Sequence, residues 1–436
     1  MSSPSSVGEA ALSAGPAEVV EALEEARERT LALVAPVSDE DLEQVHSTLM
    51  SPLVWDLGHI AAFEDLWLVH RYDDRPMLRP DLAEVYDAME TPRAGRGDLP
   101  FLGPAGARDY MDSVRECVLE IIDRRGVDET LHELVLRHEQ QHNETMLQTL
   151  QLARLRGYEP PGAVTLPAAP APAPTGLEMV EVPGGECEIG APRDGFAYDN
   201  ERPRHRTDVR GYRMGSTPIT NATYLHFAEG GGYQRREWWS DEGWSWKEEY
   251  DITRPGGWTA DHTAEWRLGT LEPLDPHRPV VHVSWFEADA FARAHDARLP
   301  TEFEWEKAAT WDQDLGLARR YPWGTERPVP GVHANVDQLG SGPAPAGAYP
   351  KGASPYGCLG MIGDVWEWTA SEFDRYEGFA AYPYREYSEP FFRAGYRVLR
   401  GGSWATRPRV ATPTFRNWDH PERRQIFSGL RIARDL

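Results

Sequence analysis

The chain has 436 residues, with 45 Lys and Arg against 70 Asp and Glu, and a formal net charge of −25. Such an acidic chain repels phosphate backbones and anionic lipids, so we expect binding to neither nucleic acid nor a membrane. Its three cysteines exclude a disulfide framework and a thiolate-rich zinc or iron–sulfur site. The sequence has no apolar run near the roughly 18 residues that cross a bilayer and no signal-peptide pattern at its start. We expect a cytoplasmic protein of two or three domains, and a monomer.

The first half of the sequence has a helical pattern. Residues 1–16 are small and polar, and we expect them to be disordered. From residue 17 to residue 158, apolar residues recur at spacings of three and four, which predicts a four-helix bundle. The four helical stretches lie at 17–34, 52–72, 106–125 and 129–156.

The composition changes after the helical half. Residues 159–176 are rich in Pro and Ala, which is typical of a semi-rigid linker. Residues 177–436 contain frequent Gly, Pro and Trp, and this favours short strands between long ordered loops. We expect helices locally at 284–297 and at 301–311, the second with Thr301 as its N-cap. The predicted fold class is therefore α+β, with more than one domain.

A metal site is indicated by the pentapeptide HEQQH. His138 and His142 lie four residues apart, so both imidazoles share one face of a helix and can reach one ion. A site needs at least one more ligand, and His59, beside an apolar stripe of an earlier helix, is the best candidate. His70 and His132 compete for that place. The residue pattern alone does not separate a metal site from solvated or core histidines.

The same pentapeptide matches the H-E-x-x-H motif of zinc proteases, in which Glu139 would be the general base. The extended form of that motif has Gly three positions after the second His and another His three positions further. This chain has Thr145 and Gln148 there. A Glu ligand from a following helix would fall in or beyond the linker, so the protease is a minor alternative.

The second half contains a series of motifs in a recognisable order. They include MVEVPGGECEIG (179–190), NERPRH (200–205), GDVWEWTAS (363–371), RVLRGGSWA (397–405) and FSGLRIAR (427–434). This segment resembles the formylglycine-generating-enzyme, or sulfatase-modifying-factor, family, which implies a C-type-lectin-like fold. Members that generate formylglycine use two cysteines late in the chain. Cys187 and Cys358 do not occupy those positions, so that activity is not expected.

In the first half, MSPLVWDLGHI and HEQQHNETML resemble the DinB-like bundle. The two folds in this order resemble the sulfoxide synthases of ergothioneine biosynthesis over almost the whole chain. The resemblance implies a mononuclear non-heme Fe(2+) enzyme that uses O2. It would join the sulfur of gamma-glutamylcysteine to the imidazole C2 of hercynine and leave a sulfoxide. It also implies that the iron ligands are His59, His138 and His142.

The resemblance assigns residues to the two organic substrates. Asn417 and Trp418 would line the hercynine pocket, and Gln141 would contact the hercynine imidazole. An aromatic wall suits a quaternary ammonium through cation–π attraction. Arg93 and Arg96 would hold the two carboxylates of gamma-glutamylcysteine in bidentate pairs, and Asp419 would take its ammonium.

The resemblance also implies a tyrosine that supplies a proton or an electron to the oxygen chemistry. It would lie in the stretch RYEGFAAYPYREYSEPFF (375–392), which contains Tyr376, Tyr382, Tyr384 and Tyr387. The fit of Y-x-x-Y-S favours Tyr384 or Tyr387 and does not separate the two.

Three alternatives remain open at this point. An ovothiol-type synthase couples cysteine to unmethylated histidine at another ring carbon, but it usually carries a further methyltransferase domain, for which we see no room after Leu436. A hercynine sulfoxide synthase that uses cysteine is the second alternative. The third belongs to a different class: a binding module that has lost catalysis, which the loss of iron ligands would signal.

Overall fold

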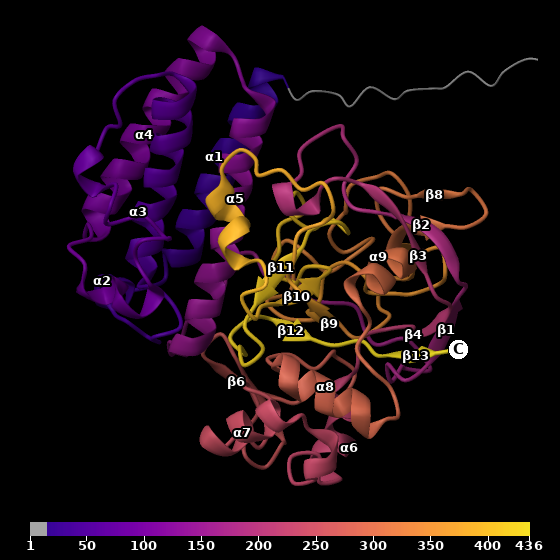
Figure 1. Ribbon diagram of the computed structural model, residues 1–436. Coiled ribbons are helices and arrows are strands. Elements are labelled where there is room, and N and C mark those ends of the chain that lie inside the picture. The colour runs from indigo at the N-terminus through magenta and orange to yellow at the C-terminus, as the bar shows by residue number, and fades with distance from the viewer. Residues whose placement is uncertain (1–14) are drawn as a thin grey trace, which may run out of the picture.

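The computed structural model describes residues 15–436 and shows a helical bundle on one side of a loop-rich domain (Figure 1). Most of the segment expected to be disordered, residues 1–14, lies outside the described part. The last residue of the segment expected to be disordered, Pro16, is ordered, because it opens the first helix. Proline is well placed there, since the first helical position needs no N–H donor.

Four long helices form the bundle, as the apolar spacing predicts. They are α1 (Pro16–Val34), α3 (Leu53–Glu64), α4 (Pro104–Arg125) and α5 (Glu129–Ala153), with the short α2 (Asp39–Glu43) after α1. Helix α3 continues directly into the π-helix η1 (Asp65–Tyr72). Gly126, with φ 83°, ends α4, and the side chain of Asp128 caps the start of α5 by accepting from the backbone N–H of Thr130 and Leu131.

The second domain has little regular structure and several small sheets. The largest has the order β11-β10-β9-β12, and a second has the order β1-β4-β13. The strands of these two sheets are β9 (Trp366–Glu372), β10 (Arg397–Arg400), β11 (Asn417–Asp419), β12 (Ser428–Gly429), β1 (Met179–Val182), β4 (Tyr212–Gly215) and β13 (Ala433–Asp435). Three two-stranded pairs complete the set: β2 (Gly185–Ile189) with β3 (His205–Val209), β5 (Ala264–Arg267) with β6 (Thr270–Pro273), and β7 (Trp311–Asp312) with β8 (Leu317–Ala318).

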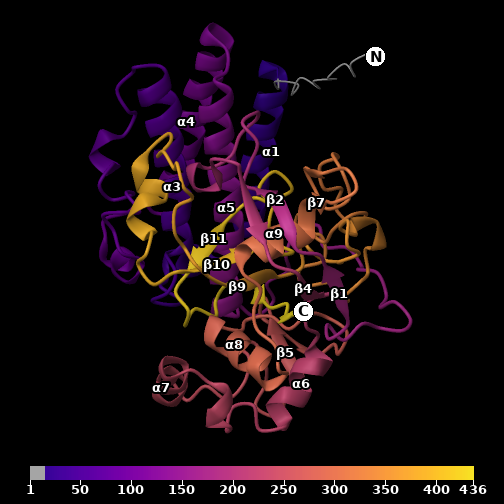
Figure 2. The same cartoon turned by 45° about the vertical axis from the view of Figure 1, so that its right-hand side comes forward.

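Four short helices lie among these strands. Helices α8 (Trp285–Ala294) and α9 (Glu302–Thr310) fall where the sequence predicts them, and Thr301 caps α9 by accepting from the N–H of Glu304. Helices α6 (Asn221–Glu229) and α7 (Asp241–Glu249) were not expected. They lie with α8 at the end of the domain shown at the bottom of Figures 1 and 2.

Buried arginines tie the loops of this domain together. Arg400 and Arg416 both pair with Glu302, and Arg431 pairs with Glu367. Each pair is fully or almost fully buried, so the hydrogen bonds between charged partners offset the cost of removing them from water. These pairs connect α9 and β9 to later segments of the domain.

The two domains meet along α5. Glu144, on that helix, is buried and accepts hydrogen bonds from Trp366 Nε1 at 2.7 Å, Ser403 Oγ at 2.7 Å and Thr406 Oγ1 at 2.6 Å. The segment between the domains, residues 159–176, forms no helix or strand, and its Val164 N–H donates to a carbonyl oxygen of the second domain. The contacts of Glu144 fix how α5 faces the second domain.

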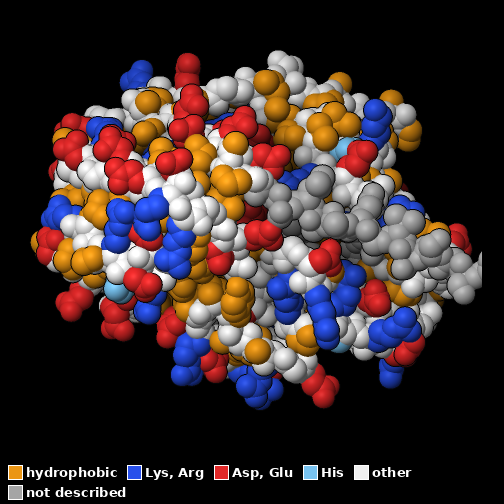
Figure 3. Space-filling model, turned by 90° about the horizontal axis from the view of Figure 1, so that it is seen from above, with side chains coloured by type: hydrophobic (Ala, Val, Ile, Leu, Met, Phe, Trp, Pro, Cys, Tyr) orange, Lys and Arg blue, Asp and Glu red, His pale blue; other side chains and the backbone are white. Residues whose placement is uncertain are grey.

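The surface carries charges of both signs. Figure 3 shows one face of the molecule, on which acidic and basic side chains lie interspersed. Within residues 15–436, no helix is both long enough and apolar enough to cross a membrane.

Candidate metal centre and substrate cavity

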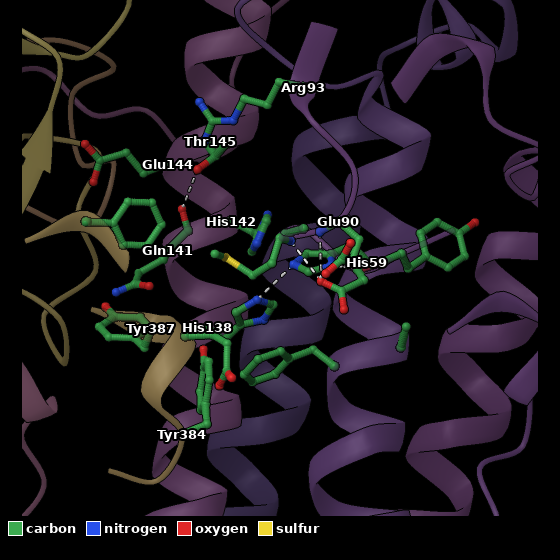
Figure 4. A pocket seen from close by; sticks show the side chains of 18 of the residues that line it. His59, Glu90, Arg93, His138, Gln141, His142, Glu144, Thr145, Tyr384 and Tyr387 are labelled. Atoms are coloured by element: carbon green, nitrogen blue, oxygen red, sulfur yellow. Dashed lines mark hydrogen bonds between the residues drawn. The ribbon is translucent and has the colours of Figure 1, made fainter. Parts of the chain in front are cut away.

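Three histidines from two helices of the bundle converge on one point (Figure 4). His59 comes from α3, and His138 and His142 lie one turn apart on α5. One nitrogen of each ring lies within 4.8 Å of the others, and His59 Nε2 is 3.1 Å from His138 Nε2. Two nitrogens bound to one ion at about 2.1 Å and at right angles lie about 3 Å apart, so this spacing fits a metal ion.

The two competing histidines do not join this cluster. His70 is exposed and its Nδ1 contacts the carbonyl oxygen of Arg75. His132 lies six residues before His138 on α5. It is buried, and its Nδ1 contacts the carbonyl oxygen of Asp128. Among residues 15–436, His59 is therefore the histidine that completes the group with His138 and His142.

A second layer of residues orients two of the rings. His59 Nδ1 lies 2.7 Å from the carbonyl oxygen of Tyr86, and His142 Nδ1 lies 3.1 Å from Asp56 Oδ1. A proton on each Nδ1 leaves the Nε2 lone pair facing the centre. Gly58 makes the first contact possible, because a Cβ at that position would lie 2.1 Å from the Tyr86 ring.

The third ring is held by stacking. Phe63 lies parallel to His138, with a centroid distance of 3.7 Å and an interplanar angle of 9°. Burial lowers the pKa of both His59 and His138 well below the usual value, and the neighbouring histidines lower it further. Both rings are therefore neutral near pH 7, which is the form that binds a metal ion.

We expect Asp56→Asn to weaken metal binding by about ten- to a hundredfold, the range for loss of a carboxylate behind a metal-bound histidine. The substitution keeps the shape but removes the charge that polarises His142. Anaerobic titration of the metal-free protein with Fe(II) or Co(II) measures the effect. Asp65→Asn is a matched control, because Asp65 is also buried on this helical segment but binds Tyr110 and Leu78 N instead. Equal affinities for wild type and Asp56→Asn would remove Asp56 from this role.

Glu139, the middle acid of HEQQH, faces away from the metal centre. It is buried in the bundle core, where it accepts from Arg27 Nε at 3.0 Å, Thr30 Oγ1 at 2.9 Å and Arg115 Nη2 at 3.4 Å. Glu64 shares the same two arginines. A carboxylate in this ion-pair network cannot reach a metal-bound water, so the geometry argues against the zinc protease alternative.

A cavity of about 1030 Å³ lies between the bundle and the second domain, with the three histidines in its wall. Every residue that the sequence assigns to the site lines this cavity. Besides the histidines, these are Arg93, Arg96, Gln141, Tyr384, Tyr387, Asn417, Trp418 and Asp419. Residues separated by more than 350 positions in the chain are thus brought to one place by the packing of the two domains.

The wall contributed by the second domain is aromatic. Trp418 stacks on Phe373 at 4.2 Å and meets Tyr387 edge-on at 5.7 Å. On the bundle side, Gln141 lies between the two histidines of α5 and donates from Nε2 to the hydroxyl of Tyr198 at 3.2 Å. Gln141 of the bundle and Trp418 of the second domain therefore both line one cavity.

Arg96 is built into the cavity wall. It is 6% exposed and donates to the carbonyl oxygens of Thr91 and Ala88 and to the hydroxyl of Ser51. Its guanidinium lies 3.8 Å from the ring centroid of Trp55. Burial lowers the pKa of Arg96 to about 10, so the group remains charged near pH 7. Two of its five N–H groups remain for a ligand.

Arg93 and Asp419 stand nearer the solvent side of the cavity. Arg93 is exposed and makes two long contacts from Nη1, 3.4 Å to the carbonyl oxygen of Leu49 and 4.0 Å to Met50 Sδ. Asp419 Oδ1 lies 3.6 Å from Arg423 Nε, and Oδ2 accepts from Gln425 Nε2 at 3.0 Å. Burial raises the pKa of Asp419, while Arg93 and Arg423 act against that rise.

Two of the four candidate tyrosines reach the cavity. Tyr384 packs against Trp67 at 5.1 Å and Phe63 at 6.4 Å, and Tyr387 stacks on Tyr198 at 4.4 Å. Burial raises the pKa of Tyr384 and Tyr387, so both are neutral phenols that hold a transferable proton. Figure 4 shows both side chains on the second-domain side of the cavity.

The other two tyrosines lie elsewhere. Tyr376 is buried in the second domain beside His205 at 4.9 Å, and Tyr382 is 47% exposed. Neither lines the cavity.

The structure adds residues that the sequence did not single out. Asp56, Phe63, Tyr198 and Arg423 all support or line the site. Arg423 follows Asp419 by four residues, a spacing that could have suggested a charge pair. The contacts of the other three are long-range and leave no local signal.

Comparison with known proteins covers both domains. A family model for the DinB superfamily matches residues 22–153, and one for the sulfatase-modifying factor enzyme 1-like domain matches residues 166–436. A hercynine oxygenase from Mycolicibacterium thermoresistibile is 46% identical over 96% of this chain and 95% of its own length. A hercynine oxygenase from Mycolicibacterium smegmatis is 46% identical over 94% of this chain and 97% of its own length. One from Mycobacterium tuberculosis is 46% identical over 95% of this chain and 98% of its own length. The chain therefore belongs to the hercynine oxygenase family.

Proposed function

We propose that this chain is an Fe(2+)-dependent sulfoxide synthase that joins gamma-glutamylcysteine to the imidazole C2 of hercynine with O2. One thiol, one imidazole C2–H and one O2 give one sulfoxide and one water. Forming the C–S bond supplies two electrons to O2, and oxidising the sulfur supplies the other two. The observation that carries the proposal is a three-histidine centre that opens into a cavity with an aromatic wall and a charged rim.

The ligand set supports ferrous iron. Imidazoles suit Fe(2+), and three protein ligands leave positions open for substrates. His59, His138 and His142 carry no charge in their neutral forms, so they leave the full charge of the ion to favour a bound thiolate. When bound, ferrous iron supplies a site for thiolate and O2 and the redox chemistry between them.

The aromatic compartment suits hercynine. Its quaternary ammonium gains cation–π attraction from aromatic faces such as Trp418 and Tyr387, and it needs no hydrogen-bond acceptor. Gln141 uses its amide nitrogen on Tyr198, which leaves its Oε1 to accept from the imidazole N–H of hercynine. Gln141 lies between the two metal-binding histidines of α5, so this contact would place the imidazole next to the metal centre. We assign Asn417, beside Trp418, to the same compartment.

Three charged side chains of the cavity, Arg93, Arg96 and Asp419, suit a thiol dipeptide with two carboxylates and one ammonium. We assign Arg93 to one carboxylate, because its guanidinium is exposed and makes only long contacts, with Leu49 O and Met50 Sδ. Arg96 would hold the other carboxylate through its two remaining N–H groups. Asp419 would take the ammonium. Local positive charge matters here, since the net charge of −25 otherwise repels an anionic substrate.

We expect Arg93→Ala to raise the Michaelis constant for gamma-glutamylcysteine by about ten- to a hundredfold, because a charged hydrogen bond contributes roughly 1.5–3 kcal/mol. The Michaelis constant for hercynine should change little. Steady-state kinetics on both substrates measures the two effects. Arg235→Ala is a control for the lost charge alone, since Arg235 is exposed and pairs with Glu237 away from the cavity. If Arg93→Ala raised the Michaelis constant for hercynine and left that for the thiol unchanged, the assignment of the two substrates to their compartments would be reversed.

The direct test of the function is an incubation of the iron-loaded protein with hercynine, gamma-glutamylcysteine and O2, followed by mass spectrometry. The expected product is the sulfoxide of the coupled substrates. Parallel incubations replace the thiol by cysteine and hercynine by histidine. Faster turnover with cysteine would make this a cysteine-using synthase, and faster turnover with histidine would indicate the ovothiol type. Absence of any sulfoxide would contradict the proposal.

A further inference from the structure

The loop that carries both cavity tyrosines has little structure of its own. It contains two single-turn 3-10 helices, η7 (Arg385–Tyr387) and η8 (Glu389–Phe391). In Figures 1 and 2 this yellow-orange segment leaves the second domain and lies against the bundle. Such a loop needs outside contacts to hold a side chain in a fixed place.

Ser388, at the junction of η7 and η8, supplies those contacts. Its side chain is fully buried, and its Oγ donates to Asp199 Oδ1 at 2.5 Å and accepts from Asn200 Nδ2 at 2.9 Å. The backbone N–H of Tyr382 lies near the same carboxyl group: burial raises the pKa of Asp199, and this N–H acts against that rise. Asp199 therefore faces the loop both before Tyr384 and after Tyr387.

The other half of this contact is firmly anchored. Asp199 and Asn200 belong to the 3-10 helix η4 (Asp199–Glu201), which is buried. Arg416 Nη1 donates to the carbonyl oxygen of Asn200 at 2.8 Å, and Thr414 Oγ1 donates to Glu201 at 2.5 Å. Arg416 is itself paired with Glu302 in the core. Through η4, the loop is thus connected to buried residues of the second domain.

The same segment also contacts the bundle. Tyr198, directly before η4, accepts from Gln141 on α5 and stacks on Tyr387. Residues 198–200 therefore contact both the helix that carries two metal-binding histidines and the loop that carries the tyrosines. This short segment therefore helps to set the distance between the metal centre and the tyrosines, together with the contacts of Tyr384 with Phe63 and Trp67.

We propose that Asp199 and Asn200, through the hydroxyl of Ser388, are positioning residues that hold Tyr384 in place at the metal centre. This inference rests on the proposed function in so far as Tyr384 acts in sulfoxide formation. Reactions that need aligned groups are sensitive to displacements of about 1 Å, which can cost about a hundredfold in rate. Loss of the Ser388 hydroxyl should therefore reduce coupling without removing any side chain that lines the cavity.

The test compares Ser388→Ala with Ser428→Ala. Ser428 is equally buried, and its hydroxyl donates to the carbonyl oxygen of Val283 instead. We expect Ser388→Ala to lower kcat for the sulfoxide about tenfold or more and to raise the share of thiol oxidised without coupling. The Michaelis constant for gamma-glutamylcysteine and the iron content should remain unchanged. Ser388→Thr, which keeps the hydroxyl, should restore most of the product ratio.

A merely structural role gives a different result. Loss of folded protein in Ser388→Ala would lower the rate but leave the product ratio of wild type, and that outcome would overturn the proposal. Ser428→Ala should keep the ratio of wild type. A shift of the ratio in Ser428→Ala as large as in Ser388→Ala would also count against it.

Hydrogen exchange measured by mass spectrometry tests the contact without any turnover. Amides of residues 382–391 should exchange at least about tenfold faster in Ser388→Ala than in wild type, while those of α5 remain unchanged. Equal exchange would refute the positioning role even in an active enzyme. A wild-type protein that makes no sulfoxide would refute the proposed function, and the exchange result would still decide whether Ser388 holds the loop.

Discussion

Replacing His59, His138 or His142 by alanine is expected to remove most of the bound iron and to lower sulfoxide formation by more than a hundredfold. Loss of a group behind a metal ligand already costs about ten- to a hundredfold in affinity, and loss of a ligand itself should cost more. Within residues 15–436, the cluster contains no fourth His, Cys, Asp or Glu that could take the place of the missing ring. Metal analysis of the purified variants and product detection by mass spectrometry measure the two losses.

His70→Ala is the matched control, since His70 follows His59 on the same helical segment but lies exposed outside the cluster. It should keep the iron and the activity of wild type. Thermal unfolding of the metal-free proteins shows whether each ligand variant is folded. A folded His59→Ala with full iron and full activity would show that the third ligand is a different residue.

Local sequence pattern predicts the part of the metal centre that lies on one helix. His138 and His142 share a face because four residues make slightly more than one turn. The same geometry turns Glu139 about 100° away from His138, so its position among Arg27 and Arg115 agrees with helical periodicity. The Glu of an H-E-x-x-H protease has the same rotation, so only the contacts of Glu139 in the structure argue against that motif.

The third ligand and the tyrosines depend on long-range packing. His59 meets His138 across 79 positions of sequence, and no periodicity encodes that contact. The apolar stripe made His59 the best candidate but left His70 and His132 as competitors, and the resemblance to a known family then favoured His59. Ser388 and Asp199 lie 189 positions apart, and both look like ordinary polar loop residues until the fold brings them together.

The helices also differ in how far the sequence predicts them. The four long helices follow from apolar spacing over many residues, which is a strong signal. Helices α6 and α7 have only nine residues each, and their starts at Thr220 and Ser240 resemble loop sequence. Their formation depends on packing against the rest of the second domain, since helices this short are not stable alone.

Tyr384→Phe is expected to reduce sulfoxide formation by about a hundredfold to ten-thousandfold, the range that general acid–base groups contribute. The substitution removes only the hydroxyl and keeps the ring that packs against Phe63 and Trp67. Because burial raises the pKa of Tyr384, its hydroxyl holds a proton that it can supply to the reacting oxygen. Iron content and both Michaelis constants should remain near wild type, and the thiol should be oxidised without forming the C–S bond. Kinetics with product analysis measures this.

Tyr387→Phe separates the two candidates that the sequence leaves open. Tyr387 lies flat on Tyr198 and edge-on to Trp418, so its ring serves mainly as a wall of the aromatic compartment. Its Phe variant keeps both contacts, and we expect it to lose less than about tenfold in sulfoxide formation. Tyr382→Phe, at an exposed position of the same loop, should behave like wild type. If Tyr387→Phe abolishes coupling while Tyr384→Phe does not, the proton donor is Tyr387, and Tyr384 only packs against the face of the bundle.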